Sequence, residues 1–236
     1  SFNSANTIAA SEQVGIYMVG NFGATVANNM IRLGIKTDGN PVNTSNNLTG
    51  IYDNSTAACN YYFNTVLING ASAASGVAAN TYAFRRAAAS GAKILQNNIF
   101  ANNRTGGAGG SLHLAFATNT VTGYTGTNFN YNIYHSADGT YFSTTASPAS
   151  IAGGTPALKL QNLRTLVSGS NLKSGVATLS QINFVSPAGD ASAVSLKLAN
   201  PTAASNAGVN GTGETTDREG DSRTTTPEIG ADEGPF

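Results

Sequence analysis

A four-residue phrase recurs four times between residues 28 and 134, and it restricts the possible folds more than any other feature of the chain. Each copy is an Asn-bearing pair followed by two large apolar residues: Asn28-Asn29-Met30-Ile31, Asn64-Thr65-Val66-Leu67, Asn97-Asn98-Ile99-Phe100 and Tyr131-Asn132-Ile133-Tyr134. Their first residues are 36, 33 and 34 positions apart. Regular periods of about 20 to 50 residues are typical of repeat architectures, in which each unit buries its apolar face against its neighbours. The chain is therefore predicted to be a repeat protein.

A second phrase lies between the copies of the first. Gly15-Ile16-Tyr17-Met18 recurs as Gly50-Ile51-Tyr52-Asp53 and, more loosely, as Thr81-Tyr82-Ala83-Phe84. The apolar runs are short, contain β-branched and aromatic residues, and are bounded by Asn, Gly and Ser, which favours strands over helices. We therefore expect two short strands per unit, and an all-β, right-handed parallel β-helix as the fold.

The repeat is longer than a plain β-helix rung of roughly 20 residues, so each unit should contain a rung and a side loop. In the first unit, residues 36–47 have turn-forming composition throughout. The corresponding inserts in later units are residues 71–80 and 104–111. Inserts at the same point of successive rungs are expected to lie along one flank.

The Asn residues of the repeated phrase suit the corners of such a rung. Asn tolerates left-handed backbone conformation, and stacked side-chain amides can both donate and accept hydrogen bonds along a column. The pattern leaves open which Asn of a pair is used, and turn residues facing water are the alternative. The predicted structural ladder is Asn29, Asn64, Asn98 and Asn132.

The tail carries a more specific pattern. Residues 217–223 read Asp-Arg-Glu-Gly-Asp-Ser-Arg, and residues 226–233 read Thr-Pro-Glu-Ile-Gly-Ala-Asp-Glu. With the repeats, this ending resembles right-handed β-helix proteins of the pectate-lyase-like superfamily, particularly C-terminal β-helix domains of secreted surface proteins of the Bacteroidetes and Chlorobi type. The resemblance implies that residues 182–185 and 196–198 form irregular last rungs. It implies little about function, because the superfamily contains lyases, hydrolases and adhesins.

We therefore expect one domain, with rungs and side loops over residues 1–213 and a polar cap over residues 214–236. The cap should cover the last rung, with Arg218 and Arg223 pairing with carboxylates of the tail. The first rung should remain uncovered. Asp217, Glu219 and Asp221 also have the composition of a calcium loop, although the distal bidentate Glu of such loops is missing. Calcium is the one cofactor that the sequence suggests, and a cap is the preferred interpretation.

Other chemistry is sparse in the sequence. Only five acidic residues precede residue 213, and their spacing does not match one rung, so paired catalytic carboxylates are not expected. His113 and His135 are interpreted as unrelated surface residues, and the Arg85-Arg86 pair as a solvated strand edge. Cys59 is expected to be a small buried residue, since one Cys in 236 residues excludes a disulfide framework.

Composition agrees with an extracellular or cell-surface protein. Charged residues make up 10% of the chain and the formal net charge is zero, so nucleic acid binding is not expected. No stretch of the sequence approaches about 18 consecutive apolar residues, so membrane insertion is not expected either. We expect a non-catalytic structural or adhesive module that joins a second copy, or a longer parent chain, through its uncovered first rung and forms fibres. Surface glycans are candidate ligands. The alternative is a polysaccharide-binding or polysaccharide-degrading protein, suggested by the superfamily and by Tyr17, Tyr52, Tyr61, Tyr62, Tyr82 and Tyr134.

Overall fold

The computed structural model describes residues 12–44, 46–74, 78–144, 151, 153–167, 173–200 and 202–233. Most of these residues form a parallel β-solenoid whose rungs stack in three sheets. Sheet A contains, in hydrogen-bonded order, β1 (Glu12–Gly20), β4 (Asn47–Ser55), β8 (Thr81–Arg86), β12 (His113–Thr118) and β15 (Tyr141–Ser143). Sheet B contains β2 (Ala24–Ala27), β5 (Cys59–Tyr62), β9 (Lys93–Gln96) and β13 (Phe129–Asn130). Sheet C contains β3 (Met30–Leu33), β6 (Thr65–Ile68), β10 (Ile99–Asn102), β14 (Ile133–Ser136) and β16 (Gly175–Val176).

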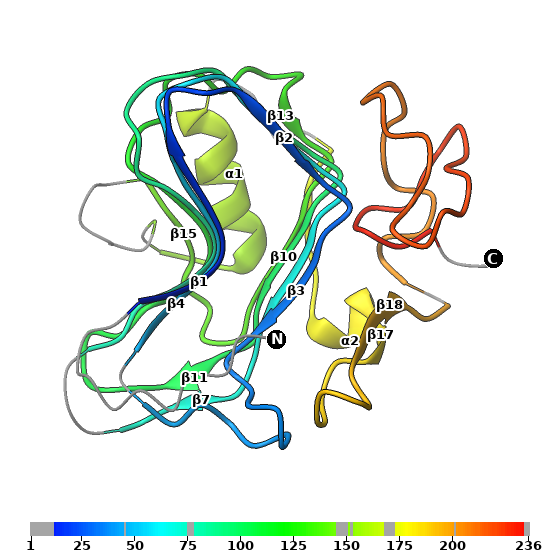
Figure 1. Cartoon of the computed structure of the whole chain (residues 1–236). Coiled ribbons are helices and arrows are strands. Elements are labelled where there is room, and N and C mark those ends of the chain that lie inside the picture. Colours follow the sequence, from blue (N-terminus) through cyan, green and yellow to red (C-terminus); the bar gives the residue numbers. More distant parts are fainter. Residues whose placement is uncertain are drawn as a thin grey trace.

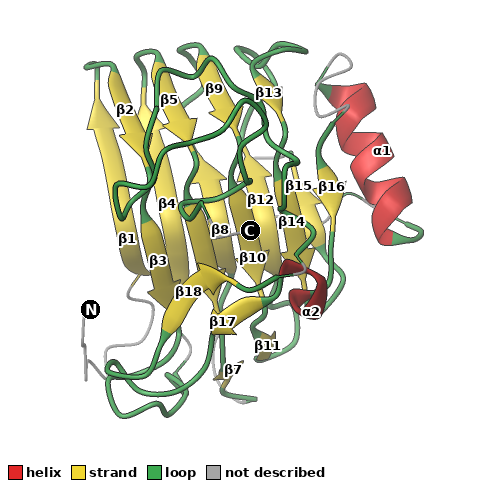
Figure 2. Ribbon diagram, turned by 90° about the vertical axis from the view of Figure 1, so that its right-hand side faces the viewer, coloured by secondary structure: helices red, strands yellow, loops and turns green. Residues whose placement is uncertain are grey.

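The predicted β-helix is confirmed, and its hand is right-handed. In Figure 1, which looks along the solenoid, the chain runs up through β1, across through β2 and down through β3. Figure 2 shows β1 at one end of the row of strands and α1 at the other, with β1 on the side that is nearer the viewer in Figure 1. Seen in Figure 1, the chain therefore turns clockwise as it moves away from the viewer. That sense of rotation is right-handed.

Each rung has three strands, whereas the sequence predicted two. The second phrase forms sheet A and the Asn phrase leads into sheet C, but sheet B was missed. Its strands share no phrase: they read Ala-Thr-Val-Ala, Cys-Asn-Tyr-Tyr and Lys-Ile-Leu-Gln. They pair in parallel nonetheless, because the corners on either side of them fix their register.

The two apolar residues of the Asn phrase point to opposite faces of sheet C, as period-two alternation requires. Ile31, Val66, Phe100 and Tyr134 join the solenoid core. Met30, Leu67, Ile99 and Ile133 form a second cluster on the outer face. Sheet C therefore needs a cover on its outside, and the rest of the chain provides it.

That cover begins where irregular last rungs were expected. Residues 182–185 and 196–198 do not extend the solenoid. They contribute to α2 (Leu179–Ile182) and to an antiparallel pair, β17 (Phe184–Ser186) with β18 (Ser195–Leu198), which lies outside sheet C (Figure 2). Phe184, Leu196 and Leu198 pack into the outer cluster.

The far end of the solenoid is closed by a helix that the sequence did not predict. Helix α1 (Pro156–Leu166) starts at Thr155, whose side chain accepts a hydrogen bond from the Leu158 amide. Leu160 and Leu163 on this helix belong to the solenoid core, and Figure 1 shows α1 inside the outline of the rungs. The end at which a polar cap was expected is therefore closed by a helix that places Leu160 and Leu163 in the core.

Residues 202–233 do not cover the last rung. They run back along the outside of the solenoid, next to the corner between sheets B and C. Arg223 pairs with Glu233 at 3.0 Å, as expected, but its guanidinium also lies 3.7 Å from the ring centroid of Phe63 in the second rung. Asn28 in the first rung donates to the Thr216 carbonyl at 3.0 Å. The tail thus spans the outside of the first three rungs.

The side loops occupy one flank, the lower part of Figure 1, where β7 (Ala71–Ser72) pairs in parallel with β11 (Thr105–Gly106). Arg104 is fully buried beneath them and donates to the Val42 and Asn69 carbonyls. Cys59 is buried, which confirms that expectation. In the described part of the chain, no helix has the length and apolar character needed to cross a membrane.

Candidate functional site

The predicted ladder residues form a continuous hydrogen-bonded column at the corner between sheets B and C. The side-chain Nδ2 of Asn29 donates to Oδ1 of Asn64, that of Asn64 to Asn98, and that of Asn98 to Asn132, each at 2.9 Å. Each backbone amide donates to the same acceptor, at 3.3 Å from Asn29 and 3.0 Å from Asn64 and Asn98. Asn64, Asn98 and Asn132 are completely buried.

The left-handed backbone position is the residue before each ladder Asn, which differs from the sequence interpretation. Asn28, Phe63, Asn97 and Tyr131 have φ between 52° and 61°. Their side chains point outward, and the tail binds three of them. Asn97 exchanges two hydrogen bonds with Val209, at 2.7 and 2.9 Å. Both members of an Asn pair are thus used, one for the ladder and one for the tail.

The ladder has a direction. A backbone N–H can only donate and a backbone carbonyl can only accept, so the bonds from the Asn64 amide and to the Val26 carbonyl fix the Asn side chains in one orientation. At the last rung the amide of Asn132 donates to Oγ of Ser174 at 2.9 Å. At the first rung, Oδ1 of Asn29 receives no hydrogen bond from any described residue. The column therefore ends in an open acceptor.

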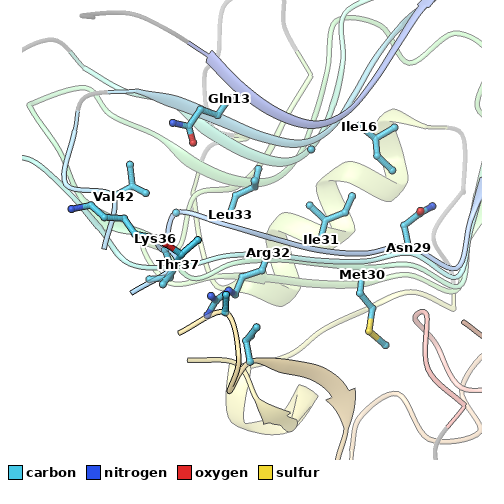
Figure 3. Close-up of a pocket in the computed structure, with 15 residues that line it drawn as sticks. Gln13, Ile16, Asn29, Met30, Ile31, Arg32, Leu33, Lys36, Thr37 and Val42 are labelled. Atoms are coloured by element: carbon cyan, nitrogen blue, oxygen red, sulfur yellow. The ribbon is translucent and has the colours of Figure 1, made fainter. Parts of the chain in front are cut away.

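That acceptor lies at what we call the first-rung end: the outward edges of β1, β2 and β3 and the cavity between them. Each of these strands is the outermost of its sheet, so within the described residues its outer edge pairs with no strand. A cavity of about 480 Å³ opens there, and Figure 3 shows Ile16 and Ile31 facing it from opposite sheets. Asn29 lines the same cavity. Apolar interior and unpaired backbone are exposed together at this end.

A stack of aromatic and guanidinium groups lies on the outer face of sheet A and begins at the first-rung end. The rings of Tyr17 and Tyr52 stack with centroids 5.0 Å apart. Arg85 lies over the other side, 4.8 Å from the Tyr52 centroid and 5.0 Å from that of Tyr82. Tyr17 is 51% exposed and ends the stack. Tyr61 and Tyr134, also considered for sugar stacking, lie in the core instead.

The acidic residues of the tail meet in a different set from the one predicted. Asp217, Glu219 and Asp232 bring carboxylate oxygens within 4.8 Å of one another, whereas Asp221 is not part of this group. Asp217 already accepts backbone amides from Glu219, Asp221 and Glu233 at 2.8 to 2.9 Å. Burial raises the pKa of Asp232, although the Leu198 amide opposes that shift. These contacts organise the turn.

A second acidic contact lies close by. Glu228 is buried, and burial, followed by the neighbouring Glu233, raises its pKa to about 7. Glu233 is held by Arg223, so the two carboxylates and the guanidinium form one buried group. Arg223 in turn connects this group to the solenoid, because its guanidinium lies over Phe63 and donates to Asn28 Oδ1 at 2.9 Å.

The histidines are not surface residues. His113, on β12, is buried, with Nδ1 2.8 Å from the Thr81 hydroxyl and Nε2 2.9 Å from the Gly106 carbonyl. His135, on β14 in another sheet, is also buried, with Nδ1 3.1 Å from the Ala177 carbonyl, and burial lowers its pKa. Both imidazole rings form hydrogen bonds with backbone or side-chain oxygens of adjacent segments.

Three other buried charged residues, Arg86, Lys93 and Asp53, also bind structural partners. The pair Arg85-Arg86 is not at a strand edge, because β8 lies between β4 and β12. Arg86 is fully buried and donates to the carbonyls of Ala88, Ser90, Gly91 and Thr122. Lys93 and Asp53, both completely buried, form an ion pair at 3.0 Å. The sequence did not predict that these side chains are buried, because loop carbonyls that converge on a cation come from distant segments and leave no local pattern.

Comparisons with protein-family models, with curated proteins and with solved structures gave no match to this chain.

Proposed function

We propose that this protein is a non-catalytic structural or adhesive module of an extracellular or cell-surface protein. In this proposal the domain is one segment of a rod, and the rod continues at the first-rung end. The observation that carries the proposal is the contrast between the two ends of the solenoid. Helix α1 fills the core at one end, while at the other, within the described residues, the outer edges of β1, β2 and β3 pair with no strand and a cavity lies between Ile16 and Ile31.

Unpaired strand edges favour association, and natural sheets usually cover, shorten or charge them. The edge of β1 is long and carries little charge: β1 has nine residues with Glu12 as its one charged residue, and its last third includes Val19, which is 60% exposed, while Phe22 beyond it is 80% exposed. The buried polar residues add support, because Lys93, Arg86 and His113 are all engaged with structural oxygens. The resemblance to the pectate-lyase-like superfamily of secreted proteins is consistent with the proposed location.

Electron microscopy of the source cells tests this proposal, with a gold-labelled antibody raised against the full chain. We expect label on extracellular or surface rods. Label confined to the cell interior would overturn the proposal, and so would turnover of polysaccharides by the purified full chain, measured as new reducing ends or unsaturated products.

Polysaccharide binding is a second candidate, favoured by the exposed Tyr17 at the end of the stack on sheet A. Aromatic rings bind sugars through their faces. Tyr52 has Tyr17 on one face and Arg85 on the other, so only the outer face of Tyr17 is available. Titration of neutral and acidic oligosaccharides into the full chain and into Tyr17→Ser tests this candidate, which predicts binding that the substitution abolishes.

A further inference from the structure

The polarity of the Asn ladder specifies what the first-rung end can accept. In every step of the column, one rung offers two donors, the backbone N–H and Nδ2 of its Asn, to the Oδ1 of the next. Asn29 keeps its own Oδ1 toward the open side, with no donor among the described residues. An occupant that continues the pattern must place two N–H donors over Asn29.

From this geometry we propose that the first-rung end binds a parallel β-solenoid rung that carries an Asn at its corner. This inference rests on the proposed function and names the partner that the open end fits. Such a rung satisfies the Asn29 acceptor, pairs with the edges of β1, β2 and β3, and fills the cavity beside Ile16 and Ile31 with apolar side chains.

The outer face of sheet A points to the same occupant. Successive rungs stack like residues in register: Tyr17 opposes Tyr52, and Ile16 opposes Ile51. The stack of Tyr17, Tyr52 and Arg85 ends at Tyr17, whose outer ring face is directed to the position of a preceding rung. An aromatic or guanidinium group at that position of the added rung would extend the stack.

A second copy of this chain does not supply such a rung. Its last rung is closed by α1, which fills the core through Leu160 and Leu163, so head-to-tail stacking is blocked. Two copies meeting at their first-rung ends would bring the Oδ1 acceptors of their Asn29 residues together without a donor. The partner is therefore a rung of another β-solenoid segment, and the chain alone does not build a fibre.

The test adds one rung to the full chain. A second copy of residues 47–79 is inserted directly before Glu12, with residues 1–11 kept ahead of it. The insertion preserves register, because β1 pairs with β4 from Glu12 opposite Asn47, and β4 pairs with β8 from Leu48 opposite Thr81. The inserted Asn64 then lies over Asn29. Hydrogen exchange of the amides of β1, β2 and β3 is measured in the chain with and without the insert.

We expect exchange of these amides to slow at least tenfold in the extended chain, because the edge strands become internal. Asn64→Ala in the inserted copy alone should reduce that protection severalfold, because it removes the Nδ2 donor to Asn29 and leaves only the backbone N–H. Asn60→Ala in the inserted copy is the matched control, because this Asn is not in the ladder and, among the described residues, its side chain bonds to Thr25 on the neighbouring strand. It should leave the protection unchanged.

Three results would overturn the proposal. The inserted rung could leave the exchange of β1, β2 and β3 unaltered. Its Asn64→Ala and Asn60→Ala forms could behave alike. The unextended chain could form dimers or longer oligomers at micromolar concentration in light scattering, which would show that a second copy does fit. None of these outcomes depends on where microscopy locates the protein, so the proposed function and this inference can fail separately.

Discussion

Replacement of Asn98 by Ala removes the centre of the ladder and should be among the most destabilising polar substitutions in the chain. The side chain of Asn98 donates to the Tyr61 and Gln96 carbonyls and to Asn132, and it accepts from both the backbone amide and Nδ2 of Asn64. All of this occurs at a completely buried position. The Asn64 amide is left without its acceptor in a site that water does not reach.

An unsatisfied buried polar group costs about 1 to 3 kcal/mol. Asn98→Ala orphans the Asn64 amide and leaves the Asn132 oxygen and the Tyr61 carbonyl with fewer donors, so we expect a loss of about 3 kcal/mol or more in the free energy of unfolding. Asn29→Ala should cost only about 1 kcal/mol, because this half-buried site admits water as a replacement partner. Asn21→Ala, at an exposed position, is the control and should change stability by less than about 0.5 kcal/mol.

Urea denaturation of the three variants gives the order of stability, and hydrogen exchange of the Asn64 amide reports the local effect. A difference of about 2 kcal/mol between Asn98→Ala and Asn29→Ala corresponds to roughly thirtyfold in exchange rate. If all three variants unfolded at the same urea concentration as the parent, the ladder would contribute nothing to stability. The direction assigned to the column would then have no energetic meaning.

Three further predictions concern the tail and the end helix. Glu228 has a folded pKa of about 7 against an ordinary 4.5, so the folded state holds its proton more tightly and stability should fall as pH rises from about 4.5 to 7. Glu228→Gln should raise stability at pH 8 by at most about 3 kcal/mol and have little effect near pH 4; equal urea midpoints for variant and parent at pH 8 would contradict this. Leu163→Ala in α1 should lower the free energy of unfolding by about 2 to 5 kcal/mol, whereas Leu158→Ala, at a 49% exposed position, should lower it by less than about 0.5 kcal/mol. Equal thermal midpoints for the two variants would argue that α1 does not close the core. About 1 mM calcium should shift the thermal midpoint by less than about 1 °C, because the oxygens of Asp217 already accept backbone amides; a larger shift, lost in Asp232→Asn, would establish a calcium site.

The sequence was sufficient for sheets A and C of each rung, because their determinants are local and repeated, but not for sheet B, whose strands share no phrase. The phrase at residues 28, 64, 97 and 131 marks the corner, and the alternation of its two apolar residues places one inside and one outside sheet C. Apolar residues on both faces of these strands are typical of a sheet that is covered on both sides, as sheet C is. The paired Asn residues gave both the ladder and the left-handed corner, although the pattern did not say which residue has which role.

The missed features depend on contacts between distant residues. Helix α1 has little sequence signal beyond Thr155 and Pro156 at its start, and its apolar face is defined by the end of the solenoid that it fills. The path of the tail is fixed by partners such as Thr216 and Asn28, which are 188 residues apart. Asp221 was placed in a calcium loop from composition, but the fold brings Asp232 to that position instead.

The return of the tail to the first rungs has a consequence for the order of folding during synthesis. A solenoid can add rungs one by one as they leave the ribosome, since each needs only its neighbour. Here the corner side chains of Asn28, Phe63 and Asn97 find their partners only when residues 209–230 have been made. These rungs must therefore persist without their outer cover until residues 209–230 have been synthesised, so the packing of the tail follows the formation of every later rung.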